Sequence, residues 1–292
     1  MKKKIALILA GIMMMSCFAV GCSSSGGETT AATTADTTGE SGSEAAGETT
    51  ASDSERTTFI VGFDASFPPY GYQEDGEYVG FDLDLAQEVC DRNGWELVKT
   101  PIDWDAKDME LDSGAIDCIW NGFTMNGRED AYTWSDPYVD NSQVFVVSKD
   151  SGITSPSELA GKIVLVQKDS SALAALNDEE NTELQELKNS FSDLVEVPEY
   201  ESALLELEAG SADAVAMDIG VAKAKQKNND NIVILDGEDD IIASEQYGIG
   251  FKLGNEELRD QVQATLDEMA ADGTFQEIAE KWDLTDSICL GE

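Results

Sequence analysis

The sequence predicts an α/β protein with mainly parallel sheets, and two observations support this prediction. From residue 57 onward, short apolar runs typical of buried strands alternate with longer stretches of helical periodicity. A weak internal repeat relates "WDAKDMELDSGAIDCIWNG", which begins at Trp104, to "YESALLELEAGSADAVAMD", which begins at Tyr200. In both copies a glycine suited to ending a helix precedes an apolar strand with a polar tip. We therefore expect two similar α/β halves.

The elements are expected in the following order. Strands are expected at 59–63, 117–120, 144–147, 163–166, 214–217, 232–235 and 248–251. Helices are expected at 82–93, 104–113, 171–188, 200–209, 218–227, 255–271 and 274–282. Ligands of open α/β sheets bind at the carboxyl ends of strands, so the polar strand tips at Asn121, Gly122 and Asp218 are candidate binding positions.

Composition excludes several classes of function. The 292 residues include 59 acidic and 18 basic side chains, a net charge of −41, so we expect no binding to nucleic acid or to anionic lipid. Histidine is absent, which excludes His-containing catalytic triads and His-ligated zinc. The chain also has no C-x-x-C pair, P-loop or G-x-S-x-G motif. We expect a monomer that is not an enzyme and has no cofactor or metal ion.

The first 21 residues have the features of a secretion signal. Three lysines precede an apolar run from Ile5 to about Met15, which is too short for a comfortable membrane span. The segment ends in "AVGC", which resembles the lipobox of bacterial lipoproteins, and that resemblance implies that Cys22 is lipidated after cleavage. The alternative is an ordinary signal peptide followed by a chance cysteine.

Residues 22–56 have the composition of a tether. Positions 23–56 contain only Ser, Gly, Thr, Ala, Glu, Asp and one Arg, so no large apolar side chain is available to form a core and we expect disorder. A flexible coil of this length spans roughly 30–35 Å. The expected product is an exported protein tethered by lipid to the outer face of a bacterial cytoplasmic membrane.

The stretch "GFDLDLAQEVCDRN" at 80–93 combines a helix with a family signature. Asp82 is expected to cap the helix and Gly94 to end it. Its apolar face is expected to consist of Leu83, Ala86, Val89 and Cys90. The same run resembles a signature of extracellular solute-binding protein family 3, the polar amino-acid receptors of ABC importers. Further similarity lies in "VGFDASFPPYGY", "IDCIWNGFT", "SDPY", "SELAGKIVLVQKDSS", "SADAVAMD" and the segment from "YGIGFKLG" to "IAEKW".

The resemblance covers nearly all of 57–283 and implies a bilobed fold. This is the periplasmic-binding-protein-like type II fold, in which two α/β lobes are joined by two crossing strands. Lobe 1 is expected to comprise 57–144 plus 242–292, and lobe 2 to comprise 145–241. By resemblance, the cleft between the lobes closes over a free amino acid, which is then delivered to an ABC permease and its ATPase.

A free amino acid is a zwitterion, so its burial requires a fixed cation and fixed acceptors. The resemblance makes Arg128 the clamp for the ligand carboxylate, supported by the Thr124 hydroxyl, and a guanidinium suits this role because it donates two parallel hydrogen bonds. Three residues separate Thr124 from Arg128 where the family pattern has four, and Gly127 is suited to an altered turn. The alternative is a surface ion pair of Arg128 with Glu129 or Asp130.

Other positions acquire roles through the same resemblance. Asp218 is expected to bind the ammonium group, with Asn121 and Gly122 nearby, although Asp218 is also placed to cap a helix. Ser170 is expected to meet the ligand carboxylate at a helix start, where free N–H groups favour anions.

The remaining predicted contacts concern the ligand's side chain. Phe67 is expected to pack on its aliphatic part, with core packing as the alternative, and Trp104 to form the other wall. Asp64 is expected to reach its polar end or the ammonium group. These features favour a polar or basic amino acid. Cys90 and Cys118 are expected as buried thiols, and a disulfide among them and Cys289 is left open.

Two other functions fit the same fold. One is an enzyme like the dehydratases of small carboxylic acids, which would need a general-acid carboxyl group in the cleft. The other is a sensing module that signals to a transmembrane partner. A ligand screen separates the enzyme from a binding protein, because only an enzyme changes its ligand.

Overall fold

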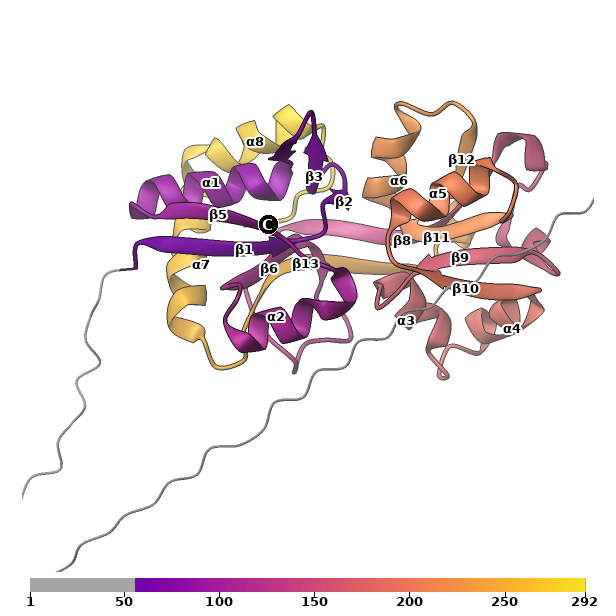
Figure 1. Ribbon diagram of the computed structural model, residues 1–292, viewed down its shortest axis with the longest axis horizontal. Coiled ribbons are helices and arrows are strands. Elements are labelled where there is room, and N and C mark those ends of the chain that lie inside the picture. The colour runs from indigo at the N-terminus through magenta and orange to yellow at the C-terminus, as the bar shows by residue number, and fades with distance from the viewer. Residues whose placement is uncertain (1–55, 292) are drawn as a thin grey trace, which may run out of the picture. The chain divides into compact units, whose positions relative to one another are not determined.

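The computed structural model describes residues 56–291 (Figure 1). The predicted signal peptide, Cys22 and the tether up to residue 55 lie outside the described residues. Helices and strands alternate as expected, and ten strands form one sheet in the order β10-β9-β11-β8-β13-β6-β1-β5, with β12 beside β8 and β7 beside β13.

One end of the sheet, here called the β1 half, is parallel. Its strands are β1 (Thr58–Phe63), β5 (Glu96–Pro101) and β6 (Cys118–Thr124). A separate antiparallel sheet contains β2 (Ser66–Phe67), β3 (Gly71–Glu74) and β4 (Glu77–Val79). The surrounding helices are α1 (Phe81–Asn93), α2 (Lys107–Ser113) after a 3-10 turn at Trp104–Ala106, α7 (Glu256–Asp272) and α8 (Thr274–Trp282).

The other end, here called the β9 half, repeats the plan. Parallel strands β9 (Ile163–Gln167), β10 (Asp193–Val197) and β11 (Ala214–Asp218) are joined by β12 (Ile232–Leu235) across β8. Its helices are α3 (Ser171–Asn177), α4 (Thr182–Ser190), α5 (Tyr200–Glu208) and α6 (Ile219–Gln226).

The two halves are joined by β8 (Val139–Ser148) and β13 (Ala243–Phe251). These strands pair antiparallel with each other and with every neighbour, including the short β7 (Thr133–Trp134). The prediction of mainly parallel sheets is therefore correct for the flanks and wrong for the centre. A chain that crosses from one half to the other and later returns must run in opposite directions on its two passages.

Three further differences from the predicted elements have local causes. The single helix expected at 171–188 is divided into α3 and α4, because Asn181 starts a new helix by accepting a hydrogen bond from Leu184 N at 3.1 Å. Strands β5 and β10 were not predicted, because both lie at sheet edges, have mostly exposed or half-buried residues and lack a long apolar run. Strands β8 and β13 also extend beyond the apolar runs that marked them.

Helix α1 begins at Phe81 with Gly80 as its N-cap, so the prediction that Asp82 caps this helix is wrong. Asp82 lies in the first turn and is fully buried. Its Oδ2 instead accepts hydrogen bonds from Gly122 N at 2.6 Å and Tyr138 Oη at 2.9 Å. Gly94 ends the helix in the left-handed conformation as expected. Asp82 therefore connects α1 to the tip of β6.

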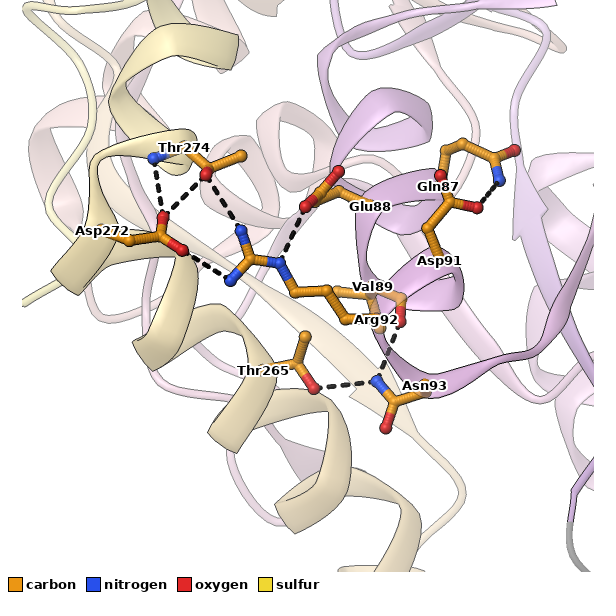
Figure 2. Close-up of polar contacts among 9 residues, drawn as sticks. All are labelled: Gln87, Glu88, Val89, Asp91, Arg92, Asn93, Thr265, Asp272 and Thr274. Atoms are coloured by element: carbon orange, nitrogen blue, oxygen red, sulfur yellow. Dashed lines mark hydrogen bonds and ion pairs between the residues drawn. The ribbon is translucent and has the colours of Figure 1, made fainter.

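An arginine at the end of α1 attaches this helix to the last two helices (Figure 2). The Arg92 guanidinium forms ion pairs of 2.8 Å with Glu88 and with Asp272, and donates to Thr274 Oγ1 at 2.9 Å. Asp272 ends α7 and Thr274 begins α8. Residues nearly two hundred positions apart thus complete the β1 half together.

The internal repeat has a structural counterpart. Asp117, just before β6, accepts a hydrogen bond from Ile60 N in β1 at 2.8 Å, and its own N–H donates to Ile60 O. Asp213, at the equivalent repeat position, makes the same two contacts with Ile163 in β9, at 2.9 Å each. The two halves therefore share contacts as well as sequence pattern.

Cys90 and Cys118 are buried free thiols, as predicted, so neither forms a disulfide with the other or with Cys289. Within residues 56–291, no helix is long and apolar enough to cross a membrane.

Candidate ligand-binding site

A small, partly open pocket with a cavity volume of about 20 Å³ lies where the two halves meet. Its lining is Phe67, Trp104, Gly122, Thr124, Arg128, Gln167, Ser170, Ser171, Tyr200 and Asp218. The predicted residues Asp64 and Asn121 are not part of this lining, whereas the other predicted ligand-binding positions are. The carboxyl ends of β6 and β11 supply Gly122, Thr124 and Asp218, as expected for an open α/β sheet.

The Arg128 guanidinium lines the pocket and forms no ion pair with any described carboxylate. Its Nη1 donates to Thr124 O at 3.2 Å, its Nη2 donates to Asp169 O at 3.1 Å, and it lies 5.3 Å from the centre of the Phe123 ring. The alternative of a surface pair with Glu129 or Asp130 is therefore not seen. No described carboxylate therefore neutralises the positive charge of Arg128.

The shortened spacing before Arg128 is accommodated by a tight turn. Arg128 N donates to Met125 O at 2.9 Å, and Gly127 has a φ of 78°, which glycine adopts without strain. The turn places the guanidinium back over Thr124, so the missing residue does not remove Arg128 from the pocket.

Asp218 is at the N-cap position of α6 but makes no capping hydrogen bond. Its Oδ1 accepts from Tyr247 Oη at 2.5 Å and from Gln143 Nε2 at 2.7 Å, and its Oδ2 accepts from Tyr200 Oη at 2.9 Å. The side chain is therefore oriented into the junction of β11, β8 and β13, so Asp218 holds the predicted N-cap position without capping the helix through its side chain.

A second buried carboxylate, Glu245 of β13, shares donors with Asp218. The side-chain amides of Asn141 and Gln143 on β8 each donate to both carboxylates, over 2.7–2.9 Å. Glu245 Oε1 also accepts from Thr124 Oγ1 at 2.9 Å, and its Oε2 accepts from the Ser171 hydroxyl. Two acidic groups, 4% and 5% exposed, thus meet at one place beside the pocket.

Burial raises the pKa of Asp218 to about 7, and repulsion from Glu245 adds to the shift despite the tyrosine and amide hydrogen bonds. An ammonium group placed at Asp218 would favour the ionised form, because it supplies the opposite charge that this site lacks. A cation beside Asp218 would therefore lower its pKa toward the ordinary value.

Folding stability is expected to fall as pH rises from 5 to 8. Burial also raises the pKa of Asp82 to about 8, so Asp82 and Asp218 both bind protons more tightly when folded than at their ordinary value of 3.8. Their stabilising contribution is complete below about pH 4 and is lost as pH passes through 7 and 8. We expect the free energy of unfolding in urea to drop by roughly 5–7 kcal/mol, at about 1.4 kcal/mol per group and pH unit, and Asp218→Asn to reduce this slope. A flat or rising profile would contradict the assignment.

Aromatic rings form two walls of the pocket. Phe67 stacks on Tyr200 with ring centres 5.9 Å apart, and Trp104 meets Phe123 edge-on at 5.4 Å. Phe67 is only 7% exposed, so it both packs in the core and lines the pocket, which unites the two predicted alternatives.

Ser170 is the N-cap at the start of α3, as predicted, and its hydroxyl accepts a hydrogen bond from Leu173 N at 3.2 Å. Its neighbour Ser171 faces the pocket as well and donates to Glu245. Ser170 is therefore fixed by a cap, whereas Ser171 links the pocket lining to the buried acid of β13.

Asp64 and Asn121 lie behind the pocket wall. Asp64 accepts from Gln167 Nε2 at 2.8 Å and from Ser66 N at 2.8 Å, and burial raises its pKa. Asn121 Oδ1 accepts from Asp64 N at 2.9 Å, while its buried Nδ2 has no partner. In this structure Asp64 acts by holding Gln167, which lines the pocket in its place.

Gly122 is at a point where no side chain fits. Its φ is 57°, and a Cβ would lie 2.8 Å from Phe67 and 2.9 Å from Tyr247. We expect Gly122→Ala to lower the free energy of unfolding by about 2–3 kcal/mol, through backbone strain and displaced rings. The control is Gly127→Ala, because Gly127 has a similar φ but no atom within 4 Å of its Cβ. We expect Gly127→Ala to lower the free energy of unfolding by only about 1 kcal/mol. Equal losses for the two variants in denaturant titrations would contradict this account.

Sequence reasoning missed Gln167, Ser171, Tyr200 and Glu245. Tyr200 carried a readable signal, since it occupies the same repeat position as Trp104, which was predicted. Gln167 is the last residue of strand β9, whereas the expected strand at 163–166 stops one residue before it. Glu245 lay outside the apolar run that marked β13.

Contacts between the halves surround the pocket. The buried ammonium of Lys107 pairs with Asp169 and lies 5.3 Å from the centre of the Trp104 ring. Burial lowers the pKa of Lys107 to about 8. Ser66 Oγ also donates to Glu199 Oε2 at 2.6 Å. Residues of the β1 half therefore contact residues of the β9 half at more than one point.

Known proteins are similar to this chain over most of its length. L-cystine-binding protein TcyJ of Escherichia coli (strain K12) is 30% identical over 236 residues, covering 78% of this chain and 83% of that protein. The arginine-binding extracellular protein ArtP of Bacillus subtilis (strain 168) is 30% identical over 242 residues, covering 79% and 88%.

A solved structure is similar to this chain as well. A substrate-binding protein of an ABC uptake transporter from Streptococcus pneumoniae, with bound histidine, superimposes with a TM-score of 0.70 at 32% identity, covering 77% of this chain and 92% of that one. This likeness confirms the predicted periplasmic-binding-protein-like type II fold. The family model for bacterial extracellular solute-binding proteins, family 3, matches residues 59–285, and the chain belongs to that family.

Proposed function

We propose that this protein captures a free amino acid outside the cell and delivers it, chemically unchanged, to the permease and ATPase of an ABC transporter. One observation carries the proposal: a guanidinium without a carboxylate partner and a buried carboxylate pair meet at the same pocket. A zwitterion needs both groups, because its carboxylate and its ammonium each lose water on burial.

The charges in the pocket favour polar or basic amino acids over acidic ones. The charge of Lys107 is matched by Asp169, which leaves Arg128 against Asp218 and Glu245. A second carboxylate on the ligand would add repulsion, whereas a neutral or cationic side chain would not. Similar proteins are named for binding cystine, arginine and histidine.

The two halves correspond to the lobes in this proposal. Lobe 1 comprises 57–144 plus 242–292, lobe 2 comprises 145–241, and β8 with β13 forms the connection about which they close. Asp64, Phe67, Trp104, Asn121, Gly122, Thr124, Arg128, Ser170 and Asp218 remain the proposed ligand-binding set, with Asp64 and Asn121 supporting it from behind.

Calorimetric titration of the purified protein with each of the common amino acids and with cystine tests this function. We expect one or a few ligands to bind with Kd near 1 μM or below, about −8 kcal/mol, and to be recovered unchanged. Absence of binding by all of them, or formation of a product, would contradict the proposal.

We also propose that Cys22 carries the lipid that tethers the protein to the outer face of the membrane. Cys22→Ser should then release the protein into the medium or periplasm, as seen by fractionation, because a single cysteine provides the anchor. Retention of the variant in the membrane fraction would contradict this.

A further inference from the structure

Two hydroxyl groups that line the pocket both donate to one buried acid behind it. Thr124 Oγ1 donates to Glu245 Oε1 at 2.9 Å, and the Ser171 hydroxyl donates to Glu245 Oε2. Glu245 is 5% exposed and is not part of the lining. A hydroxyl group has a single proton, so both oxygens present only lone pairs to the pocket. At these two positions the pocket therefore offers hydrogen-bond acceptors and no donors.

The direction of these two bonds follows from the other partners of Glu245. Its Oε1 also accepts from the side-chain amides of Asn141 and Gln143, each at 2.7 Å. Four donors thus converge on a group with about four acceptor sites, and hydrogen bonds to the charged form of a carboxyl group favour that form. An ionised Glu245 can only accept, so the protons of Thr124 and Ser171 stay directed at it.

The carboxylates of Glu245 and Asp218 have only neutral partners. The titratable side chains that face them are Tyr70, Tyr200 and Tyr247, from the β2–β3 connection, α5 and β13. Burial raises the pKa of all three tyrosines well above 10, so they are neutral hydroxyl groups. Among the described residues, no lysine or arginine forms an ion pair with either acid. This end of the pocket therefore lacks a compensating positive charge.

We infer that Glu245 is a positioning residue that makes this end of the pocket selective for a cationic group with several N–H donors, an inference that rests on the proposed function. A primary ammonium has three donors and no acceptor. Three acceptors line this end of the pocket: Asp218 and the hydroxyl oxygens of Thr124 and Ser171. Thr124 then contacts the ammonium of the amino acid, and the carboxylate is bound by Arg128 without the Thr124 hydroxyl.

The two acids also link binding to the release of a proton. Burial and repulsion from Glu245 raise the pKa of Asp218 to about 7, so Asp218 is about half protonated at pH 7 in the ligand-free protein. A cation beside Asp218 favours its ionised form, so the proton passes to the solvent as the amino acid binds. Replacing Glu245 with a neutral residue removes the repulsion, and less proton should then be released.

Calorimetry at pH 7 in two buffers with different ionisation enthalpies measures this release for the amino acid found in the screen. We expect about half a proton per bound amino acid for the unaltered protein, and clearly less for Glu245→Gln, with Kd raised at least tenfold. The control is Asp140→Asn, because Asp140 is an exposed acid of β8 that accepts from Gln246, the neighbour of Glu245. It should change neither quantity. Unchanged proton release or unchanged Kd in Glu245→Gln would overturn the inference.

A ligand analogue tests which group Thr124 contacts. The analogue is the carboxylic acid that has hydrogen in place of the ammonium group of the same amino acid, measured by competition. Thr124→Val and Ser171→Ala should each raise the Kd of the amino acid about tenfold and that of the analogue less than twofold. Equal losses for both compounds would place the hydroxyl groups on the carboxylate and overturn the inference. These two variants also decide the matter if Glu245→Gln does not fold.

A measurement without any ligand separates this inference from the proposed function. If no amino acid binds, the proposed function fails, but the carboxyl carbon of Asp218 can still be titrated by NMR in the ligand-free protein. Glu245→Gln should lower the midpoint of that titration, because repulsion from Glu245 is one cause of the raised pKa of Asp218. An unchanged midpoint would show that Glu245 does not act on Asp218.

Discussion

Replacing Arg128 with alanine is expected to raise the Kd of the amino acid at least a hundredfold, a loss of about 3–5 kcal/mol. The guanidinium lines the pocket without a carboxylate partner, so its removal leaves the ligand carboxylate buried and unpaired. Arg128→Lys should restore only part of the affinity, because an ammonium cannot donate two parallel hydrogen bonds in one plane. Calorimetry at constant ionic strength measures both variants.

Arg92→Ala is the matched control for charge. Arg92 forms ion pairs with Glu88 and Asp272 and donates a hydrogen bond to Thr274 (Figure 2). It does not line the pocket. Its loss should lower the unfolding free energy by about 1 kcal/mol and leave Kd unchanged. Equal affinities of the Arg128→Ala protein and the unaltered protein would show that Arg128 is not the clamp.

Replacing Asp218 with asparagine is expected to change affinity and stability in opposite directions. Kd should rise at least a hundredfold, about 3 kcal/mol or more, because the ligand's ammonium loses its charged partner. The ligand-free protein should become more stable at pH 8 by about 1–2 kcal/mol, since the repulsion between Asp218 and Glu245 disappears. The asparagine oxygen can still accept from Tyr247 and Gln143.

Asp213→Asn provides the control on the same side of the molecule. Asp213, beside the start of β11, has a lowered pKa that reflects hydrogen bonds from Ile163 N and from Lys162, so its loss should destabilise the protein without changing Kd. Urea titrations and calorimetry on both variants test the contrast. If Asp218→Asn is destabilising at pH 8, the carboxylate pair is not under electrostatic strain.

Elements with strong local signals were predictable from sequence. Helix α8 at 274–282 was predicted with its observed limits, because its apolar periodicity begins just after Gly273. Strands β5 and β10 were not predicted from sequence, because an edge strand has only a weak apolar pattern. Pairing with a neighbouring strand stabilises each of them: β5 pairs with β1, and β10 pairs with β9. Edge strands depend on partners that a local reading does not contain.

The residues of the site also differ in whether the sequence could predict them. Arg128 and Asp218 followed from the family resemblance, and each lies at the pocket. Glu245 did not, because its role depends on register: it is opposite Asn141 where β13 pairs with β8, and Gln143 is opposite Asp218 where β11 pairs with β8. A cluster assembled from three strands has no signature in any one of them.

The connection of α1 to α7 and α8 also sets an order for folding. All strands of the β9 half come from one continuous stretch of chain, whereas the β1 half needs β13, α7 and α8 from the last fifty residues. Local contacts form faster than distant ones, so the β9 half should gain amide protection first in pulsed hydrogen exchange. A chain emerging N-terminus first then cannot complete its first half until its final helices have emerged.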